Sequence, residues 1–259
     1  MPHSSNNPRI AFVASASPKA REAAAVLIAR YGDTSLDEAE LIVALGGDGF
    51  MLRTLHDHLD RGLPVYGMKL GRVGFLMNQF EPDSLRDRVA AAHPAVLHPL
   101  EMRVVLADGK QVSALAFNEV SLLRQTNQAA HVEVALNGAV KLENLICDGV
   151  LVATPAGSTA YNLSVQGPII PVGAPLLALT PISPFRPRHQ RGVLLPDTAT
   201  VTIEVLESER RPVAAVADHD EVRSVTRVDI RRDPDIAMRM LFDPGHNLDE
   251  RILREQFVH

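Results

Sequence analysis

A short glycine-rich segment carries the residues best suited to phosphate chemistry. Residues 41–52 read LIVALGGDGFML, where an apolar strand-like run meets Gly46, Gly47, Asp48 and Gly49 before a helix-like pattern. Glycines at a helix start leave backbone amides open to a phosphate. A carboxylate there would repel the phosphate, so Asp48 should either accept a proton from a hydroxyl or position a metal that accompanies phosphates. The alternative is a plain strand-to-helix turn in which Asp48 caps the helix.

A second segment combines hydroxyls, an acid and an aromatic ring. Residues 146–171 read ICDGVLVATPAGSTAYNLSVQGPIIP. The strand-like GVLVAT leads to Ser158 and Thr159, at the start of a predicted short helix that carries Tyr161. Two free hydroxyls and an aromatic side chain suit a nucleotide, whereas the alternative is an ordinary helix cap with Tyr161 in the core. Asp148, followed by a glycine, is also typical of a hairpin turn.

An amide and a carboxylate interrupt an otherwise apolar strand pattern. Asn118 and Glu119 stand in the stretch ALAFNEVSLL. Burying such groups without partners would be costly. We therefore expect this pair to have polar partners, of which a ligand is one candidate.

These motifs fall on two kinds of predicted structure, of which the first is α/β. Strands that alternate with helices imply right-handed crossovers and a parallel sheet, with the ligand crevice beyond the carboxyl ends of the strands. GGDG falls at such an end, so we expect a Rossmann-like amino-terminal domain. The predicted strands cover residues 9–15, 41–47 and 63–71, and the predicted helices cover 18–32 and 50–62.

After about residue 100, short alternating runs separated by turn signals predict an all-β carboxy-terminal domain. Examples are MRVVLAD, HVEVALNG, GVLVAT and TVTIEVLE. The final run LFDPGHNLDERILREQF predicts a turn and then an amphipathic helix that returns to the first domain. Its apolar face would consist of Leu248, Ile252, Leu253 and Phe257. The predicted domains are residues 1–99, 100–235 and 236–259.

Composition and charge indicate which kinds of binding partner to expect. The 259 residues are 46% hydrophobic, enough for a proper core, and a net charge of -5 is spread without long blocks of one sign. We therefore expect no nucleic-acid and no membrane partner. Cys147 is the single cysteine, which excludes an intrachain disulfide framework and fits a reducing, cytoplasmic location.

In four motifs the chain resembles the bacterial NAD kinases, the ATP- or polyphosphate-dependent NAD kinase family. They are GGDG with Arg53 following, KLGRVGFL at 69–76, FNEV at 117–120 and DGVLVATPAGSTAYNLS at 148–164. GGDG alone is shared with diacylglycerol, sphingosine and 6-phosphofructokinase relatives, whereas its combination with the last two motifs is specific to the family. The resemblance implies an α/β domain followed by a β-rich NAD-binding domain.

The resemblance also implies roles for individual residues. Asp48 would be the base that takes the proton from the adenosine ribose 2′-hydroxyl of NAD as it attacks the γ-phosphate of ATP. Gly46, Gly47 and Gly49 would hold the ATP phosphates, with Mg²⁺ or another divalent metal bridging them and no protein side chain assigned to the metal. The implied NAD site consists of Asp48, Gly49, Arg53, Phe75, Asn118, Glu119, Asp148, Ala156, Ser158, Thr159, Ala160, Tyr161, Asn162, Leu163 and Ser164.

The chain departs from the family pattern at several positions. Ala156 replaces the commoner threonine, Gln166-Gly167 replaces a glycine pair, and Arg72-Val73 stand where threonine and leucine are common. Residues 217–220, ADHD, stand where relatives often have a DGQ-like turn, and they are either part of the nucleotide site or a surface turn. Residues 186–191 concentrate arginines that either steer phosphates or form an exposed basic loop.

The resemblance implies an enzyme that makes NADP and assembles as a homodimer or homotetramer. A lipid or sugar kinase of the wider GGDG group is the alternative enzyme. A nucleotide-binding regulator that has lost catalysis is the alternative of another class. The sequence leaves open whether polyphosphate can replace ATP and whether NADH is accepted.

Overall fold

The computed structural model describes residues 7–71, 74–188 and 190–245, and the chain divides into two compact units. The first unit contains the described residues up to Leu97 and resumes at Ile236, and the second runs from His98 to Asp235. Each unit has its own sheet structure and its own buried core. In the described part of the chain, no helix has the length and apolarity needed to span a membrane.

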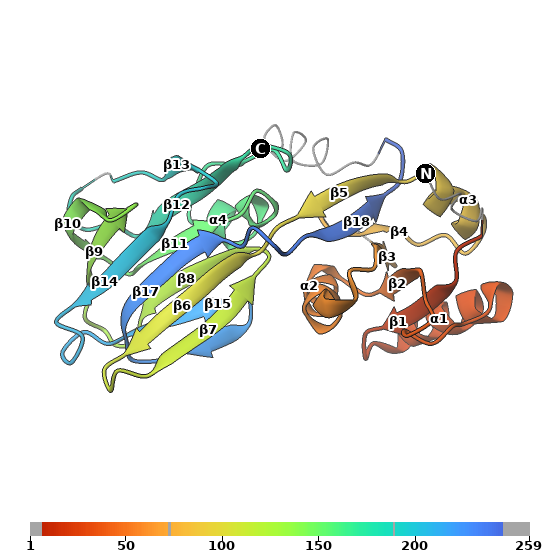
Figure 1. The fold of residues 1–259 in the computed structure, drawn as a ribbon, viewed down its shortest axis with the longest axis horizontal. Helices are drawn as coiled ribbons and strands as arrows, with labels where there is room; N and C mark the ends of the chain where they lie inside the picture. The colour runs from red at the N-terminus through yellow and green to blue at the C-terminus, as the bar shows by residue number, and fades with distance from the viewer. Residues whose placement is uncertain (1–6, 72–73, 189, 246–259) are drawn as a thin grey trace. The chain divides into compact units, whose positions relative to one another are not determined.

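The first unit is built on one sheet with the strand order β1-β2-β3-β18-β5, and the short β4 pairs with β3 (Figure 1). All pairs are parallel except β18 with β5. The predicted α/β class is confirmed. The elements are β1 (Ile10–Ala14), α1 (Pro18–Tyr31), β2 (Leu41–Leu45), α2 (Asp48–Asp57), a 3-10 turn (Leu59–Arg61), β3 (Val65–Lys69), β4 (Asn78–Gln79), α3 (Leu85–Ala91), β5 (His93–Leu97) and β18 (Met238–Phe242).

Periodicity explains how α1 and β2 form and pack. The buried residues of α1 are Ala20, Ala23, Ala24 and Leu27, which recur three or four positions apart on one helix face. All of β2, LIVAL, is buried, as expected for a parallel strand covered on both faces. This packing fixes the carboxyl end of β2, from which the glycine-rich segment leaves.

A largely buried polar cluster attaches β18 to the rest of the first unit. Asp243, directly after β18, accepts hydrogen bonds from the Tyr66 hydroxyl and from the Arg88 guanidinium. The Asn78 side chain donates to the Leu241 carbonyl at 3.0 Å and accepts from the Asp243 amide at 3.1 Å. The last described strand is thereby bonded to β3, β4 and α3.

The predicted carboxy-terminal helix lies outside the described residues, and so does its apolar face. What the structure describes of that segment is β18 and the turn that follows it through Gly245, which has a φ of +73°. The sequence pattern did not single out β18 as a strand.

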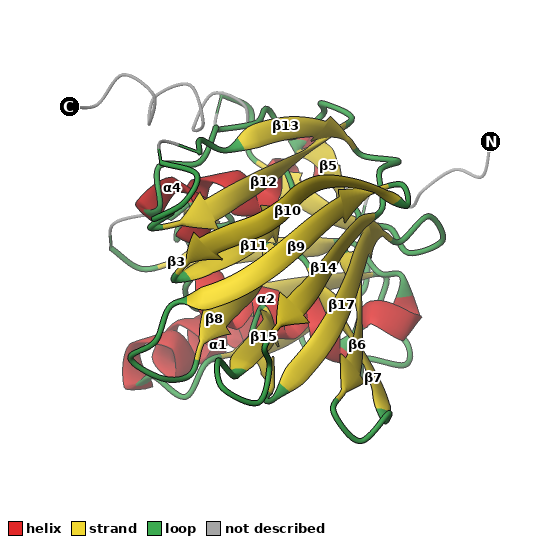
Figure 2. Ribbon diagram, turned by 90° about the vertical axis from the view of Figure 1, so that its left-hand side faces the viewer, coloured by secondary structure: helices red, strands yellow, loops and turns green. Residues whose placement is uncertain are grey.

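The second unit contains two sheets, so the all-β prediction is confirmed. One has the order β10-β9-β14-β17-β6-β7, and these strands lie side by side in Figure 2; the other has the order β13-β12-β11-β8-β15-β16. The elements are β6 (Leu100–Leu106), β7 (Gln111–Ala116), β8 (Glu119–Arg124), β9 (Ala130–Leu136), β10 (Ala139–Cys147), β11 (Gly149–Ala153), a 3-10 turn (Ala156–Thr159), α4 (Tyr161–Ser164), β12 (Leu176–Ile182), β13 (Val193–Pro196), β14 (Val201–Leu206), β15 (Val213–Ala217), β16 (Asp220–Val222) and β17 (Val225–Arg232).

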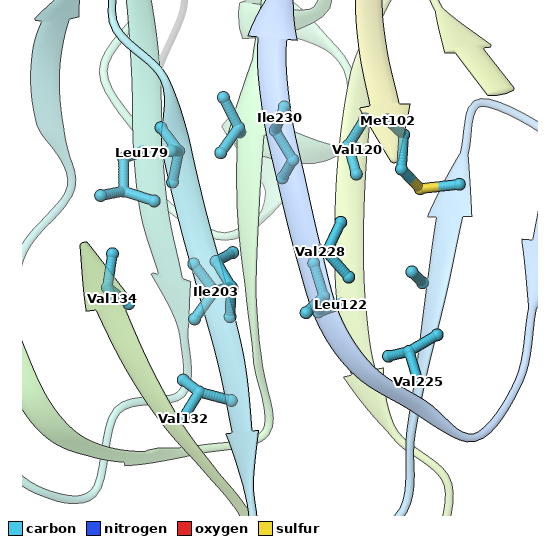
Figure 3. Packing of buried hydrophobic residues seen from close by; sticks show 14 of the residues in the cluster. Met102, Val120, Leu122, Val132, Val134, Leu179, Ile203, Val225, Val228 and Ile230 are labelled. Atoms are coloured by element: carbon cyan, nitrogen blue, oxygen red, sulfur yellow. The ribbon is translucent and has the colours of Figure 1, made fainter. Parts of the chain in front are cut away.

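Alternating residues of both sheets build the core of the second unit. In β14 every second residue is buried, beginning with Val201, as period-two patterning requires. Ile203 and Val228 from one sheet belong to the same buried cluster as Leu122 and Leu179 from the other (Figure 3). The cluster holds the strand ends from which the polar motifs of this unit project.

Candidate active site

The glycine-rich segment joins β2 to α2 at the carboxyl end of the parallel strands. The Gly46 amide donates to the Met68 carbonyl of β3 at 3.1 Å, and Gly47 is the N-cap of α2. Asp48 is the first residue of that helix, and Gly49 is exposed. The first amides of a helix have no partner within it, and the helix dipole is positive there. The segment therefore presents open amides to an anion.

Two backbone amides hold the Asp48 carboxylate in place. Its Oδ2 accepts from the Phe75 amide at 3.0 Å and its Oδ1 accepts from the Leu76 amide at 3.1 Å. A Cβ on Gly74 would lie 2.0 Å from Oδ2, so only glycine lets the backbone come this close. Each carboxylate oxygen keeps acceptor capacity beyond one hydrogen bond. The Asp48 carboxylate is thus fixed in position with acceptor capacity left over.

Lys69 ends β3 beside the same segment, and the sequence reasoning did not single it out. Its ammonium nitrogen lies 3.7 Å from the point that a Cβ on Gly47 would occupy. The side chain is half-buried, and it forms no ion pair with any residue that the structure describes. The available signal was a lysine at the last position of a parallel strand next to GGDG.

Two other predicted site residues of the first unit lie near this point in the chain. Arg53 is exposed on α2, one turn beyond Asp48, and Phe75 is half-buried and bonded to Asp48 through its amide. Arg72 and Val73 lie outside the described residues. Asp48, Phe75 and the glycines are therefore brought together, whereas Arg53 faces solvent.

In the second unit, the FNEV and TPAGSTAY motifs lie side by side. Glu119 of β8 pairs with Ala153 of β11, and the Thr154 amide donates to the Asn118 carbonyl at 2.9 Å. A Cβ on Gly157 would lie 2.0 Å from that carbonyl oxygen, so the contact requires glycine. The motifs at residues 117–120 and 154–161 are far apart in the sequence but thus meet at the ends of two neighbouring strands.

Thr154 fastens this junction and is a second residue that the sequence reasoning missed. Its buried hydroxyl donates to the Phe117 carbonyl at 2.6 Å and accepts from the Gly157 amide at 3.0 Å. The only signal was a hydroxyl residue at the end of an apolar strand.

Glu119 has an unused acceptor. Its Oε2 is buried and has no hydrogen-bond partner among the described residues. Burial, and then the charge of Asp218, raises the pKa of Glu119 to about 7, against a hydrogen bond from the Tyr161 backbone that lowers it. A buried carboxyl oxygen without a donor fits a ligand that brings hydroxyl groups.

Asp218 supports the FNEV motif from the neighbouring strand. Its carboxylate accepts from the amides of Phe117 at 2.7 Å and Asn118 at 2.9 Å, and its own amide donates to the Glu119 carbonyl at 3.2 Å. Asp218 has a φ of +52°, a left-handed conformation that aspartate tolerates better than most residues. Asp218 therefore has a structural role beside the FNEV motif, whereas His219 and Asp220 are exposed, and a place for this turn in the nucleotide site stays a prediction.

The two hydroxyls expected to be free are in fact bonded within the chain. Ser158 Oγ donates to the Pro155 carbonyl at 2.7 Å and accepts from the Ile170 amide at 3.0 Å. Thr159 Oγ1 donates to the Ala156 carbonyl at 3.3 Å. The expectation of free hydroxyls is wrong, because a carbonyl of the same turn accepts from each hydroxyl and the Ile170 amide also donates to that of Ser158.

The Asn162 side chain also forms hydrogen bonds within the chain. Its buried amide donates to the carbonyls of Ser158 at 3.1 Å and Pro168 at 2.9 Å, and its oxygen accepts from the Thr180 hydroxyl at 2.7 Å. A Cβ on Gly167 would lie 2.0 Å from that oxygen. Gly167 is thus required for this packing, and the Asn162 side chain shapes the segment.

Asp148 stands between β10 and β11, which belong to different sheets, so the hairpin interpretation is wrong. Its carboxylate accepts from Arg124 Nε at 2.6 Å, and both side chains are partly exposed. The remaining predicted residues lie in the TPAGSTAY segment or its helix: Ala156 is buried, Ala160, Tyr161 and Leu163 are half-buried, and Ser164 is exposed.

The described residues contain no group of three or more His, Cys, Asp or Glu side chains that could hold a metal ion. Mg²⁺ in phosphate-transfer sites needs only one or two carboxylates, because the substrate phosphates and water supply the other ligands. The donor set fits a metal that arrives with phosphates and does not fit a dedicated protein cage.

Comparison with known proteins identifies relatives over nearly the whole chain. Residues 117–231 match the family model described as ATP-NAD kinase C-terminal domain. A curated NAD kinase of Cereibacter sphaeroides is 56% identical over 250 residues, which cover 96% of this chain and 98% of the relative.

Two solved structures have the same fold. Yeast NADH kinase complexed with NADH superposes with a TM-score of 0.82 at 21% identity, covering 98% of this chain and 91% of that chain. An NAD kinase from Archaeoglobus fulgidus in complex with ATP gives a TM-score of 0.77 at 21% identity, covering 95% and 98%. At this identity the likeness establishes the fold alone.

Proposed function

The chain belongs to the NAD kinase family and is an NAD kinase in activity, and on that premise we propose that Asp48 is its catalytic base. The kinase transfers the γ-phosphate of ATP to the 2′-hydroxyl of the adenosine ribose of NAD and gives NADP. The observation that carries the assignment is the fixed Asp48 carboxylate at the start of α2, beside open glycine amides.

The proposed step balances through Asp48. The 2′-oxygen of the ribose attacks the γ-phosphorus, its proton passes to the Asp48 carboxylate, and the bond from the γ-phosphorus to the bridging oxygen breaks, so ADP leaves with the electron pair. Little else is asked of a protein in phosphoryl transfer beyond positioning and charge stabilisation. The amide hydrogen bonds from Phe75 and Leu76 supply that positioning for the base.

The glycine-rich segment is proposed to hold the phosphates of ATP. Gly46, Gly47 and Gly49 make up this segment; the Gly46 amide already donates to the Met68 carbonyl, so the open amides are those at the start of α2, where the positive end of the helix dipole adds to the attraction. A divalent metal such as Mg²⁺, carried by the phosphates, would neutralise part of the charge that develops during transfer. Asp48 is the carboxylate of the segment that could contact it, and Arg53 could add positive charge.

Glu119 and Asn118 are proposed to hold the adenosine part of NAD. The unused Oε2 of Glu119 supports this, since ribose hydroxyls are donors that would satisfy it. The other proposed contacts lie in or near the same unit's polar segments and in the glycine-rich segment: Gly49, Phe75, Asp148, Ala156, Ser158, Thr159, Ala160, Tyr161, Asn162, Leu163 and Ser164. Since the hydroxyls of Ser158 and Thr159 are bonded within the chain, these two would act through their backbone.

Kinetics of Asp48→Asn test the proposal. NADP formation is measured with an NADP-specific dehydrogenase, and NAD binding is measured by calorimetry. We expect turnover to fall by about 10²–10⁴-fold, because the amide cannot accept the proton, while NAD binding persists. Asp57→Asn, an exposed carboxylate at the end of the same helix, is the control and should keep its rate. A near-normal rate in Asp48→Asn would show that Asp48 is not the base.

The phosphoryl donor is tested in the same assay. Polyphosphate presents the same phosphate chain as ATP, so a parallel reaction with polyphosphate decides whether it can replace ATP. A homodimer or homotetramer and a cytoplasmic location are further proposals, which rest on the family resemblance and on the single cysteine.

A further inference from the structure

Lys69 is placed at the phosphate-binding end of the first unit by strand register. It is the last residue of β3, and its predecessor Met68 is paired with Leu45, the last residue of β2. The chain of β2 then continues directly into Gly46 and Gly47. Lys69 therefore sits beside the glycine-rich segment at the carboxyl edge of the sheet.

The side chain of Lys69 lies over bare backbone. Its Nζ is 3.7 Å and its Cε is 3.8 Å from the point that a Cβ on Gly47 would occupy. Both values are ordinary van der Waals distances, so the lysine runs along the glycine where a side chain would otherwise stand. An anion bound to the amides of this segment would meet the ammonium directly.

The charge of Lys69 has no counter-ion among the described residues. The Asp48 carboxylate accepts the amides of Phe75 and Leu76 and forms no ion pair with Lys69. A half-buried ammonium that is left unpaired favours a bound anion. The phosphates of the donor carry that negative charge. The positive charge of Lys69 would also offset the repulsion between these phosphates and the Asp48 carboxylate.

We propose that the Lys69 ammonium binds a phosphate group of the phosphoryl donor, over the backbone of Gly47. The inference rests on the proposed function and names a donor-binding residue that the motif resemblance does not assign. A lysine acts on phosphate as a compact point charge with three donors, so one flexible side chain can follow the phosphate as transfer proceeds.

The test compares Lys69→Met with the wild-type full-length protein. Binding of the non-hydrolysable β,γ-imido analogue of ATP with Mg²⁺ is titrated by calorimetry, and KM is measured for ATP and for NAD separately. We expect the analogue to bind about tenfold more weakly or worse and KM for ATP to rise in step, because a hydrogen bond to a charged group is lost. KM for NAD should stay within about twofold.

Two further variants separate charge from shape. Lys69→Arg keeps the charge and should recover most of the affinity for the analogue, although its planar head differs from an ammonium. Lys110→Met removes an exposed lysine from the β6–β7 turn of the second unit and should bind like the wild type. Methionine matches the length of the lysine stem, and circular dichroism checks that Lys69→Met is folded.

Three results would overturn the inference. They are unchanged binding of the analogue by Lys69→Met, an equal rise of KM for ATP and NAD, and Lys69→Arg as weak as Lys69→Met. Failure of the proposed function can be told apart from failure of this inference. A wild-type protein that forms no NADP would contradict the proposed function, but binding of the ATP analogue can still be titrated, and that titration alone decides the role of Lys69.

Discussion

At the scale of single residues, the carboxylates of Asp48 and Glu119, to which we assign different roles, have different surroundings. Asp48 is held by two backbone amides, one on each carboxylate oxygen, whereas Glu119 has a buried oxygen that accepts from no donor among the described residues. A carboxylate that must take a proton quickly benefits from fixed geometry, and one that must recognise hydroxyls benefits from unused acceptors. The contrast agrees with separate roles for them in one reaction.

The raised pKa of Glu119 predicts how stability depends on pH. The pKa is about 7 in the folded chain against an ordinary value of 4.5. Between these values the folded state keeps a proton that the unfolded state has released, so the free energy of unfolding falls as pH rises through this window. Glu119→Gln should escape this loss, which is at most about 3 kcal/mol for the wild type. Urea unfolding at about pH 5 and about pH 8 measures it.

The control for this experiment is Glu143→Gln, which neutralises an exposed carboxyl on β10. It should follow the wild-type pH dependence closely. If Glu119→Gln loses as much stability as the wild type between the two pH values, then the carboxyl of Glu119 is not the group that titrates.

At the scale of elements, the proposed NAD contacts of the FNEV motif depend on a neighbouring turn whose aspartate side chain binds the backbone of the motif. Asp218 leaves β15 in a left-handed conformation and accepts the amides of Phe117 and Asn118. Asp218→Ala removes both bonds and takes this acceptor from two partly buried amides, which costs up to about 1–3 kcal/mol each. We expect KM for NAD to rise about tenfold while KM for ATP changes little, in steady-state assays with each substrate varied.

His219→Ala is the matched control, since it alters the exposed neighbour in the same turn. It should leave both KM values near those of the wild type. A parallel rise of both KM values in Asp218→Ala would indicate general loss of structure and would contradict a positioning role for this aspartate.

The elements themselves could be predicted from the sequence where one local period determines them. The alanines and Leu27 of α1 recur at helical spacing, and LIVAL is a buried run of strand length, so both predictions are confirmed. The strand β18 escaped prediction because its partners are β3 and β5, which precede it by more than a hundred residues. Only pairing that is non-local in sequence makes MRMLF a strand of the first unit.

Side-chain environments could not be predicted for the same reason. The sequence places Ser158 at a helix start, but the amide that donates to its hydroxyl comes from Ile170, after the chain turns back, while the Pro155 carbonyl accepts from it locally. In the sequence Lys69 is an ordinary lysine at the end of a strand, and only the pairing register of β2 and β3 shows that it lies beside Gly47. A glycine such as Gly74 can indicate from the sequence that another group comes close to the backbone, but the sequence does not show that this group is the Asp48 carboxylate.

At the scale of the whole molecule, the chain leaves the first unit after Leu97, forms the second unit and then returns. The first sheet is therefore incomplete until residues 238–242 have been made, because β18 stands between β3 and β5. A long loop closure of this kind has an entropic cost that local contacts do not offset. The polar cluster around Asp243 is what the structure provides to hold the returning strand.

Because Asp243 holds the returning strand, we expect Asp243→Ala to lower the free energy of unfolding substantially. The Arg88 and Asp243 side chains are only 13% and 14% exposed, and Asp243 also accepts from the Tyr66 hydroxyl. Removing the aspartate leaves a largely buried guanidinium without its counter-ion, although the carbonyls of Gln79 and Glu81 still accept from it, so we expect a loss of about 3 kcal/mol in the free energy of unfolding, measured by urea titration. Asp83→Ala breaks the Arg30–Asp83 pair, whose side chains are 51% and 75% exposed, and should change stability by less than about 1 kcal/mol. Equal shifts in the two variants would mean that packing of β18 alone, without this ion pair, holds the end of the chain in the first sheet.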